Sequence, residues 1–437
     1  MSQTCKTVTV AGGGLSGSEA AWQLARRGVK VRLYEMRPNK MTPAHETGML
    51  GELVCSNSLG GEKTTTTAGI LKAELTRMGS LIMECAERSR VPAGNALAVD
   101  RDRFAATIDE KISNHPNIEL VRAELPDLPA EPPIIPPGPL TSPPLPEQPP
   151  SPTGQDFHTA PDPAPPEPHL PPAPPPKAFK ANRYGDEGDY INCPMNEEEY
   201  KNFWRELVNA ETAPRHDFEE EQMRHFDGCL PVEVIAKRGE QTLLFGPLRP
   251  VGFEAANAGE TPYAVVQLRQ DNTEGTLFNI VGFQTNLKWG EQERVFRLIP
   301  ALEHAEFVRK GVMHRNLFVC APRVLDGFLR FNGREALYIA GQASGVEGYL
   351  ESTAMGLAAA VFAYAQLAGE EMPEFPKETA VGSLLNYLKT ALPESFQPMN
   401  VNLGIFPRLG KKKIRKRTAR CEAHARRPLD APDQFIA

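Results

Sequence analysis

Long apolar runs, paired cysteines and metal-binding motifs are all missing from this sequence of 437 residues. It has no run of about 18 apolar residues, so no membrane-spanning helix is predicted. The first residues lack the charged segment, apolar segment and cleavage site of a signal peptide. The seven cysteines are widely spaced, with no CxxC pair and no cysteine–histidine cluster, which argues against a disulfide framework or a zinc site. We therefore expect a cytoplasmic protein without a metal.

An excess of positive charge is also missing, because 48 Lys and Arg stand against 55 Asp and Glu, for a net charge of −7. The whole molecule has no electrostatic preference for nucleic acid, so any such contact requires a local patch. The run KKKIRKR at 411–417 is a candidate for tRNA phosphates or for a solvated helix face, since it holds six cations in seven positions. The chain length predicts two or three domains.

A glycine-rich turn between two short strands is the first strong signal in the sequence. The segment TVTVAGGGLSGSEAAWQLARRGVKVRLYE has β-branched residues at 7–10, an alanine-rich stretch at 16–27 and a second apolar stretch at 29–34. This order predicts a strand, a glycine turn, a helix and a second strand. The glycines follow GxGxxG spacing, and Glu35 ends the second strand 23 residues after the first of them.

This spacing favours dinucleotide binding. Glycines permit a tight turn and a close backbone approach to a pyrophosphate, while the helix N-terminus offers unpaired N–H groups and a partial positive charge. Glu35 is expected to accept a hydrogen bond from a ribose hydroxyl, which favours FAD or NAD over NADP. The alternative is a purely structural glycine turn. The predicted cofactor-binding residues here are Gly12, Gly13, Gly14, Leu15, Ser16, Gly17 and Glu35.

A second strand–loop–helix unit lies at 335–369, and its strand ends at Gly341. An ordinary strand–helix unit has the same pattern, but a late unit of this kind paired with an early GxGxxG turn favours FAD, with Gly341 near the cofactor. The predicted fold class is therefore α/β, a discontinuous Rossmann-like FAD-binding domain of the glutathione-reductase type with an inserted α+β domain. We place the first part of the FAD-binding domain at 1–142, the insertion at 143–317 and the second part at 318–437.

Several long motifs are specific enough to carry a family resemblance. They span most of 5–125 and 178–410, and they read GGGLSGSEAAWQLARRGVKVRLYEMRP, MTPAHETG, ELVCSNSLGGE, RVPAGNALAVDRDRF, RYGDEGDYINCPMNEEEY, CLPVEVIAKRGEQTLLFGPLRPVG, AVVQLRQ, VGFQTNLKWGEQ, GVMHRN and AGQASGVEGYLESTAMG. On these residues the sequence resembles the folate- and FAD-dependent tRNA (uracil-5-)-methyltransferases.

The resemblance implies methylation at C5 of a T-loop uridine, position 54, in tRNA. Methylenetetrahydrofolate is the implied carbon donor, reduced FAD the reductant and NAD(P)H the co-substrate that recharges FAD. The insertion is then the part that meets tRNA. The alternatives are a related FAD oxidoreductase and another tRNA-modifying flavoprotein.

Methylation at C5 of uracil requires a nucleophile that adds at C6, and a thiolate suits this step. The resemblance implies Cys229 as this nucleophile and Cys55 as an acid/base or second covalent partner, although the two roles could be exchanged. For Cys55 the residues alone also allow simple packing. Cys193 and Cys320 lie beside prolines and are predicted to pack. The resemblance places His314 in a pterin pocket, although a lone histidine is more often structural.

The segment 126–176 departs from the family pattern because it holds 23 of the 42 prolines. Proline lacks an N–H donor and costs about 3 kcal/mol in a helix interior, so we predict no regular structure there. Read alone, the segment is a polyproline II-like tract of the kind that SH3 and WW domains bind, which suggests a non-catalytic scaffold as a further hypothesis. Its flanks, IIPPGPLTS and FHTAPDPAP, resemble family strands with prolines substituted. Loss of these strands is expected to lower stability and activity.

Overall fold

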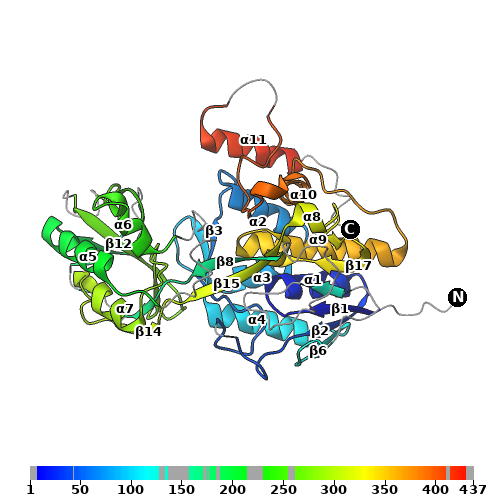
Figure 1. Cartoon of the computed structure of the whole chain (residues 1–437), viewed down its shortest axis with the longest axis horizontal. Helices are drawn as coiled ribbons and strands as arrows, with labels where there is room; N and C mark the ends of the chain where they lie inside the picture. Colours follow the sequence, from blue (N-terminus) through cyan, green and yellow to red (C-terminus); the bar gives the residue numbers. More distant parts are fainter. Residues whose placement is uncertain are drawn as a thin grey trace.

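The structure is a computed structural model that describes residues 7–42, 44–126, 133–135, 157–170, 175, 177–183, 188–213, 230–253, 261–409 and 414–429. Figure 1 shows a larger body built from both ends of the chain and a smaller body, in green, built from its middle. Each body has its own hydrophobic core.

A six-stranded sheet forms the centre of the larger body. Its strand order is β16–β17–β7–β1–β2–β6, and every neighbouring pair from β17 to β6 is parallel. A strand from late in the chain thus lies beside strands from its first part, which confirms the predicted discontinuous Rossmann-like fold. The strands are β1 Thr7–Ala11, β2 Lys30–Tyr34, β6 Ile118–Val121, β7 Pro133–Ile135, β16 Arg330–Phe331 and β17 Arg334–Ile339.

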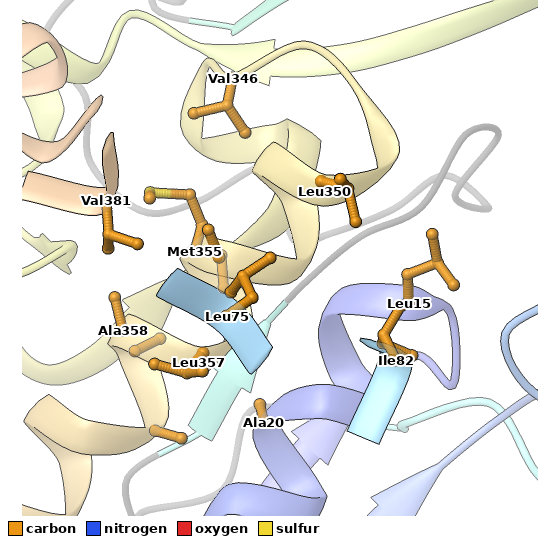
Figure 2. Close-up of a cluster of buried hydrophobic side chains, with 14 of the residues drawn as sticks. Leu15, Ala20, Leu75, Ile82, Val346, Leu350, Met355, Leu357, Ala358 and Val381 are labelled. Carbon is orange, nitrogen blue, oxygen red and sulfur yellow. The ribbon is translucent and has the colours of Figure 1, made fainter. Parts of the chain in front are cut away.

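Two helices that follow the predicted glycine loops pack directly on each other. They are α1, Leu15–Arg26, and α9, Tyr349–Ala368. A Cβ atom at Gly356 would lie 2.2 Å from the carbonyl oxygen of Ser16, so glycine is needed for this approach. Figure 2 shows the core around this contact, with labelled side chains that include Leu15, Ala20, Leu75, Ile82, Leu350 and Met355.

The other elements of the larger body surround this helix pair. No helix in the described ranges has both the length and the apolar character needed to cross a membrane. The helices are α2 Thr67–Arg77, α3 Leu81–Arg88, α4 Arg101–Ser113, α8 Ala321–Val324, α10 Ala380–Thr390 and α11 Arg417–Leu429. The 3-10 turns are η4 Gly341–Ser344 and η5 Pro393–Ser395. A small sheet consists of β3 Ser58–Gly61, β4 Arg90–Val91 and β5 Ala96–Val99.

An antiparallel sheet of order β10–β11–β12–β13 organises the smaller body. Helix α5 begins with a capping box, in which Asn196 and Glu199 each accept the other's backbone N–H. The helices bury apolar side chains in a core with the sheet. The elements are β10 Phe179–Lys180, β11 Ile191–Met195, β12 Ala264–Gln270, β13 Phe278–Ile280, α5 Glu197–Asn209, α6 Val232–Lys237, α7 Trp289–Phe296, η2 Thr242–Phe245 and η3 Pro300–Leu302.

Two antiparallel ribbons follow one another, the first between the bodies and the second at the smaller body, whose core includes Phe307. In the first, β8 (Phe157–Pro163) pairs with β15 (Met313–Val319) along its whole length. In the second, β9 (Glu167–His169) pairs with β14 (Glu306–Arg309). Figure 1 shows β8 and β15 extending between the two bodies.

The prediction that 126–176 has no regular structure is wrong for β7, β8 and β9, which all begin and end within this segment. Pro133 is the first residue of β7, where a missing N–H is tolerated. In the first ribbon the N–H of Ala164 donates to Val312 O at 2.8 Å. Because N–H directions alternate along a strand, Pro161 and Pro163 have their nitrogens on the side away from β15. The rest of 126–176 lies almost wholly outside the described residues, and binding of SH3 or WW domains to it stays a prediction.

Candidate functional site

The glycine turn after β1 has the geometry that the sequence predicts. Gly12 has a φ of +114°, a value that favours glycine. The N–H of Gly13 donates to Glu35 Oε2 at 2.9 Å. A Cβ atom at Gly13 would lie 2.3 Å from Leu50 Cδ2, whereas one at Gly14 would meet nothing within 4 Å. The turn is therefore tightly packed at Gly13, against Leu50 and Glu35, and has free space at Gly14.

The first turn of α1 is suited to an anion. Its N-cap, Gly14, makes no side-chain cap hydrogen bond, so within the described structure the N-cap residue leaves the first N–H groups of the helix open to an acceptor. Ser16 is buried, and its Oγ atom has no hydrogen-bond partner in the described structure. A buried hydroxyl beside an open glycine fits a phosphate-containing ligand.

Glu35 lies at the end of β2 in a buried charged group. Arg37 Nε lies 2.9 Å from Glu35 Oε1, and Arg37 Nη1 lies 3.0 Å from Glu52 Oε2. Burial opposes the charge on Glu35, but hydrogen bonds and the charge of Arg37, with the N–H of Gly13, bring its pKa below the usual value. Glu35 is therefore an ionised acceptor at the glycine turn. Sequence reasoning missed Arg37, which follows Glu35 by two residues.

The late loop forms a second uncapped helix start beside the first. Gly341, Gly345 and Gly348 have φ values of +67°, +96° and +113°, and Gly348 is the N-cap of α9 with no side-chain cap hydrogen bond. Because α9 packs on α1, the chain brings two glycine loops and two helix N-termini together.

Cys55 lies in the loop between β2 and β3 and is half-buried. Its backbone N–H donates to Tyr349 Oη at 2.7 Å, and Tyr349 is the first residue of α9. The loop that carries this thiol is therefore held at the helix start that follows Gly348. This placement agrees with a role in chemistry, and that role stays a prediction.

A buried charged cluster also holds this loop. Arg101, the first residue of α4, donates to Leu53 O at 2.9 Å and to Cys55 O at 2.7 Å. Its guanidinium also pairs with Asp271 at 3.0 Å and with Glu167 at 2.5 Å. Sequence reasoning missed this cluster, because its members come from three separate segments. The available signal was the motif DRDRF, in which Arg101 follows the N-cap Asp100.

Two further predicted site residues are Cys229 and His314. Cys229 lies outside the described residues. The described residues before and after it bond to the same short stretch of chain, because the N–H of Ala213 donates to Asn286 O and the N–H of Val232 donates to Gln284 O. His314 lies in β15 opposite Asp162, and nothing is described of its side chain.

The remaining cysteines and the basic run give two further results. Cys193 and Cys320 are buried, as predicted for packing, and burial raises the pKa of Cys193 to about 12. Within the basic run, 411–413 lie outside the described residues, and α11 begins at Arg417. Among the described residues, no group of His, Cys, Asp and Glu has the arrangement of a metal site.

A parallel sheet with two glycine loops, contributed by both ends of the chain, defines an α/β flavoprotein of the dinucleotide-binding class. The family model described as glucose inhibited division protein A matches residues 7–135 and 176–371. A relative named methylenetetrahydrofolate--tRNA-(uracil-5-)-methyltransferase TrmFO in Desulforudis audaxviator is 56% identical, over 97% of this chain and 96% of its own. The chain belongs to the folate- and FAD-dependent tRNA (uracil-5-)-methyltransferase family.

Further comparisons agree with this membership. Relatives of the same name from Natranaerobius thermophilus and Bacillus cereus are 52% and 50% identical, over 98% and 99% of this chain and 99% of each relative. Aquifex aeolicus GidA in its form I crystal shares the fold, with a TM-score of 0.66 and 14% identity over 98% of this chain and 77% of that one. The family model leaves out 136–175, most of the proline-rich segment.

Proposed function

We propose that this protein methylates C5 of a T-loop uridine, position 54, in tRNA, with methylenetetrahydrofolate as the carbon donor and reduced FAD as the reductant. The observation that carries the proposal is identity of 50 to 56% over nearly the whole chain with relatives that are named methylenetetrahydrofolate--tRNA-(uracil-5-)-methyltransferases. The related oxidoreductase and the non-catalytic scaffold have no comparable support.

The described residues fit FAD, and we propose how they hold it. The open N-terminus of α1, at Gly14, Leu15, Ser16 and Gly17, would take the pyrophosphate, and the ionised Glu35 would accept from a ribose hydroxyl. Gly12 and Gly13 have no side chains that would block this approach, and Gly341 begins the loop that leads to α9. When reduced by NAD(P)H, FAD supplies the hydride that completes the methyl group.

The two cysteines would handle the uracil ring. The thiolate of Cys229 adds at C6, which makes C5 a carbon nucleophile towards the one-carbon unit of the folate. A base, which we assign to Cys55, then removes the C5 proton, and tetrahydrofolate leaves the one-carbon unit. Once the hydride has been added to that carbon, loss of the thiolate from C6 restores the ring. The two roles could be exchanged. Cys55 is well placed to act as a fixed group because Tyr349 and Arg101 hold its N–H and its C=O.

The remaining assignments concern binding of the substrates. We propose that His314 contacts the pterin, and that the insertion at 143–317, between FAD-binding parts 1–142 and 318–437, receives tRNA. The separate hydrophobic core around β12 supports this division. Residues of the basic run at 411–417 would contact tRNA phosphates.

Release of tritium from a tRNA transcript labelled at C5 of uridine tests the proposal directly. With methylenetetrahydrofolate, NADH or NADPH and FAD, we expect folate-dependent release from the unmodified transcript and none when uridine 54 is replaced by cytidine. Cys229→Ala and Cys55→Ala should each abolish product. Flavin binding and NAD(P)H oxidation without any tritium release would instead identify a related oxidoreductase.

A further inference from the structure

The charged cluster beneath the Cys55 loop is not used by the proposed reaction, yet it contacts the backbone of Cys55. We propose that Arg101 is a positioning residue that, held by Asp271 and Glu167, fixes where the Cys55 thiol stands. This inference rests on the proposed role of Cys55.

The guanidinium of Arg101 makes two kinds of contact at once. One set of N–H groups reaches the carbonyl oxygens of Leu53 and Cys55, at 2.9 and 2.7 Å. The other contacts are the ion pairs with Asp271, at 3.0 Å, and Glu167, at 2.5 Å. A planar guanidinium can serve several acceptors in fixed directions, whereas an ammonium group is a point charge. The carboxylates therefore fix the plane of the guanidinium, and the guanidinium fixes the loop.

Burial makes this arrangement rigid. Arg101, Asp271 and Glu167 are all less than 10% exposed, at 6, 4 and 3%. Burial alone disfavours the charge of Arg101, but the two carboxylates outweigh it and raise its pKa. Breaking one of these buried ion pairs would strongly destabilise the folded state. The cluster is therefore expected to keep a single arrangement.

The loop is held beyond Cys55 as well. Arg269 Nε donates to Asn57 Oδ1 at 2.8 Å, and Asn57 Nδ2 donates to Gln270 O at 2.9 Å. Arg269 belongs to β12, the strand directly before Asp271. Arg269 is itself buried, at 8% exposed, so this second contact is also held within the protein interior.

The cluster ties the thiol to elements outside the FAD-binding sheet. Asp271 follows β12 of the smaller body, and Glu167 belongs to β9 within the proline-rich segment. The position of Cys55 therefore depends on correct placement of that segment. This dependence gives the proline-rich segment a role that a passive linker would not have.

Alkylation of Cys55 in the full-length protein tests the inference without relying on methylation. The rate of modification by iodoacetamide is followed by mass spectrometry of the Cys55 peptide, in Arg101→Lys and, separately, Glu167→Gln. We expect Arg101→Lys, which keeps the charge but loses the planar fork, to change the rate by about tenfold, and Glu167→Gln to change it in the same direction. Should Arg101→Lys fail to fold, Glu167→Gln decides alone.

Glu74→Gln is the matched control. Glu74 is also a buried carboxyl group, but it accepts from the N–H groups of Ala380 and Val381, and in the described structure it has no hydrogen bond or ion pair with the Cys55 loop. It should alter the melting temperature and leave Cys55 alkylation unchanged. Unchanged Cys55 alkylation in folded Arg101→Lys and Glu167→Gln overturns the inference, as does an equal change in Glu74→Gln.

Methylation kinetics separate this inference from the proposed function. In an active enzyme, Arg101→Lys should lower kcat by about tenfold with KM for tRNA unchanged, because positioning acts after binding. If the wild-type protein methylates no tRNA while alkylation still responds to Arg101 and Glu167, the proposed function fails and the positioning role stands.

Discussion

The hydroxyl of Tyr349 accepts a hydrogen bond from the backbone N–H of Cys55 at 2.7 Å, across 294 residues of sequence. Tyr349 begins α9, and Cys55 lies in the loop after β2. One side chain thus joins the early and late parts of the FAD-binding fold at the point where a reactive thiol is proposed.

Tyr349→Phe removes the acceptor and keeps the ring. A partly buried N–H that loses its partner costs about 1 to 3 kcal/mol, so we expect a lower melting temperature, faster exchange of the Cys55 amide hydrogen and reduced kcat. Hydrogen exchange with mass spectrometry measures the local effect. Tyr364→Phe, in the same helix, is the matched control; amide protection at Cys55 that is the same in all three proteins would contradict the prediction.

Alanine at the two neighbouring glycines should separate folding from cofactor binding. Gly13→Ala places a Cβ atom 2.3 Å from Leu50 Cδ2 and 3.0 Å from Glu35 Oε2, so we expect a cost of about 1 to 3 kcal/mol in the protein without FAD. Gly14→Ala enters open space and should leave that stability nearly unchanged while weakening FAD binding. Thermal melting without FAD and titration with FAD measure the two effects. Equal melting temperatures for both variants would refute this reading of the turn.

Glu74 should make stability depend on pH near neutrality. Burial raises its pKa to about 7, despite two backbone N–H donors that lower it. The folded state thus holds a proton that the unfolded state releases nearer pH 4.5, so the stabilisation is complete below about pH 4.5 and is lost as pH rises through about 7. Denaturation by urea between pH 5 and 8 should show this decline, and Glu74→Gln should flatten it. A decline of equal steepness in the variant would exclude Glu74 as its source.

The described part of the basic run should contribute to tRNA affinity through charge alone. Replacing Arg415, Lys416 and Arg417 by alanine should weaken tRNA binding and make the dependence of log affinity on log salt shallower by about 2 to 3, because each phosphate contact contributes about 0.7 to 0.9. The KM for folate should not change. Lys63→Ala with Lys377→Ala removes exposed charge elsewhere and serves as the comparison. An unaltered salt dependence in the triple variant would remove the run from the tRNA contact.

The glycine turn could be predicted from the sequence because its determinants are local. Helix α1 was expected at 16–27 and runs from 15 to 26, since the glycines before it and the apolar spacing within it are both visible in sequence. The Arg101 cluster could not be predicted, because a buried ion pair is defined by three segments that only the fold brings together. From residue type alone, Arg101 and Glu167 would be predicted to lie at the surface, as most charged side chains do.

At 157–163 the sequence led to a wrong prediction rather than a missing one, because its prolines suggested irregular structure where strand β8 forms. Their number predicted irregular structure, but what matters in a strand is the direction in which each missing N–H points. That direction depends on the pairing partner, β15, which lies more than a hundred residues further along the chain. A count of prolines therefore carries less information than their spacing of two.

The same spacing affects what the ribbon presents to other molecules. In the described structure β8 pairs with β15 alone in its sheet, so the other side of β8 is an edge. Pro161 and Pro163 each remove one N–H donor from that edge, where Phe157 and Thr159 keep theirs, and an edge with fewer donors is a poorer template for a further strand. The two prolines thus weaken the strand pairing that exchange or aggregation between molecules would need at this edge.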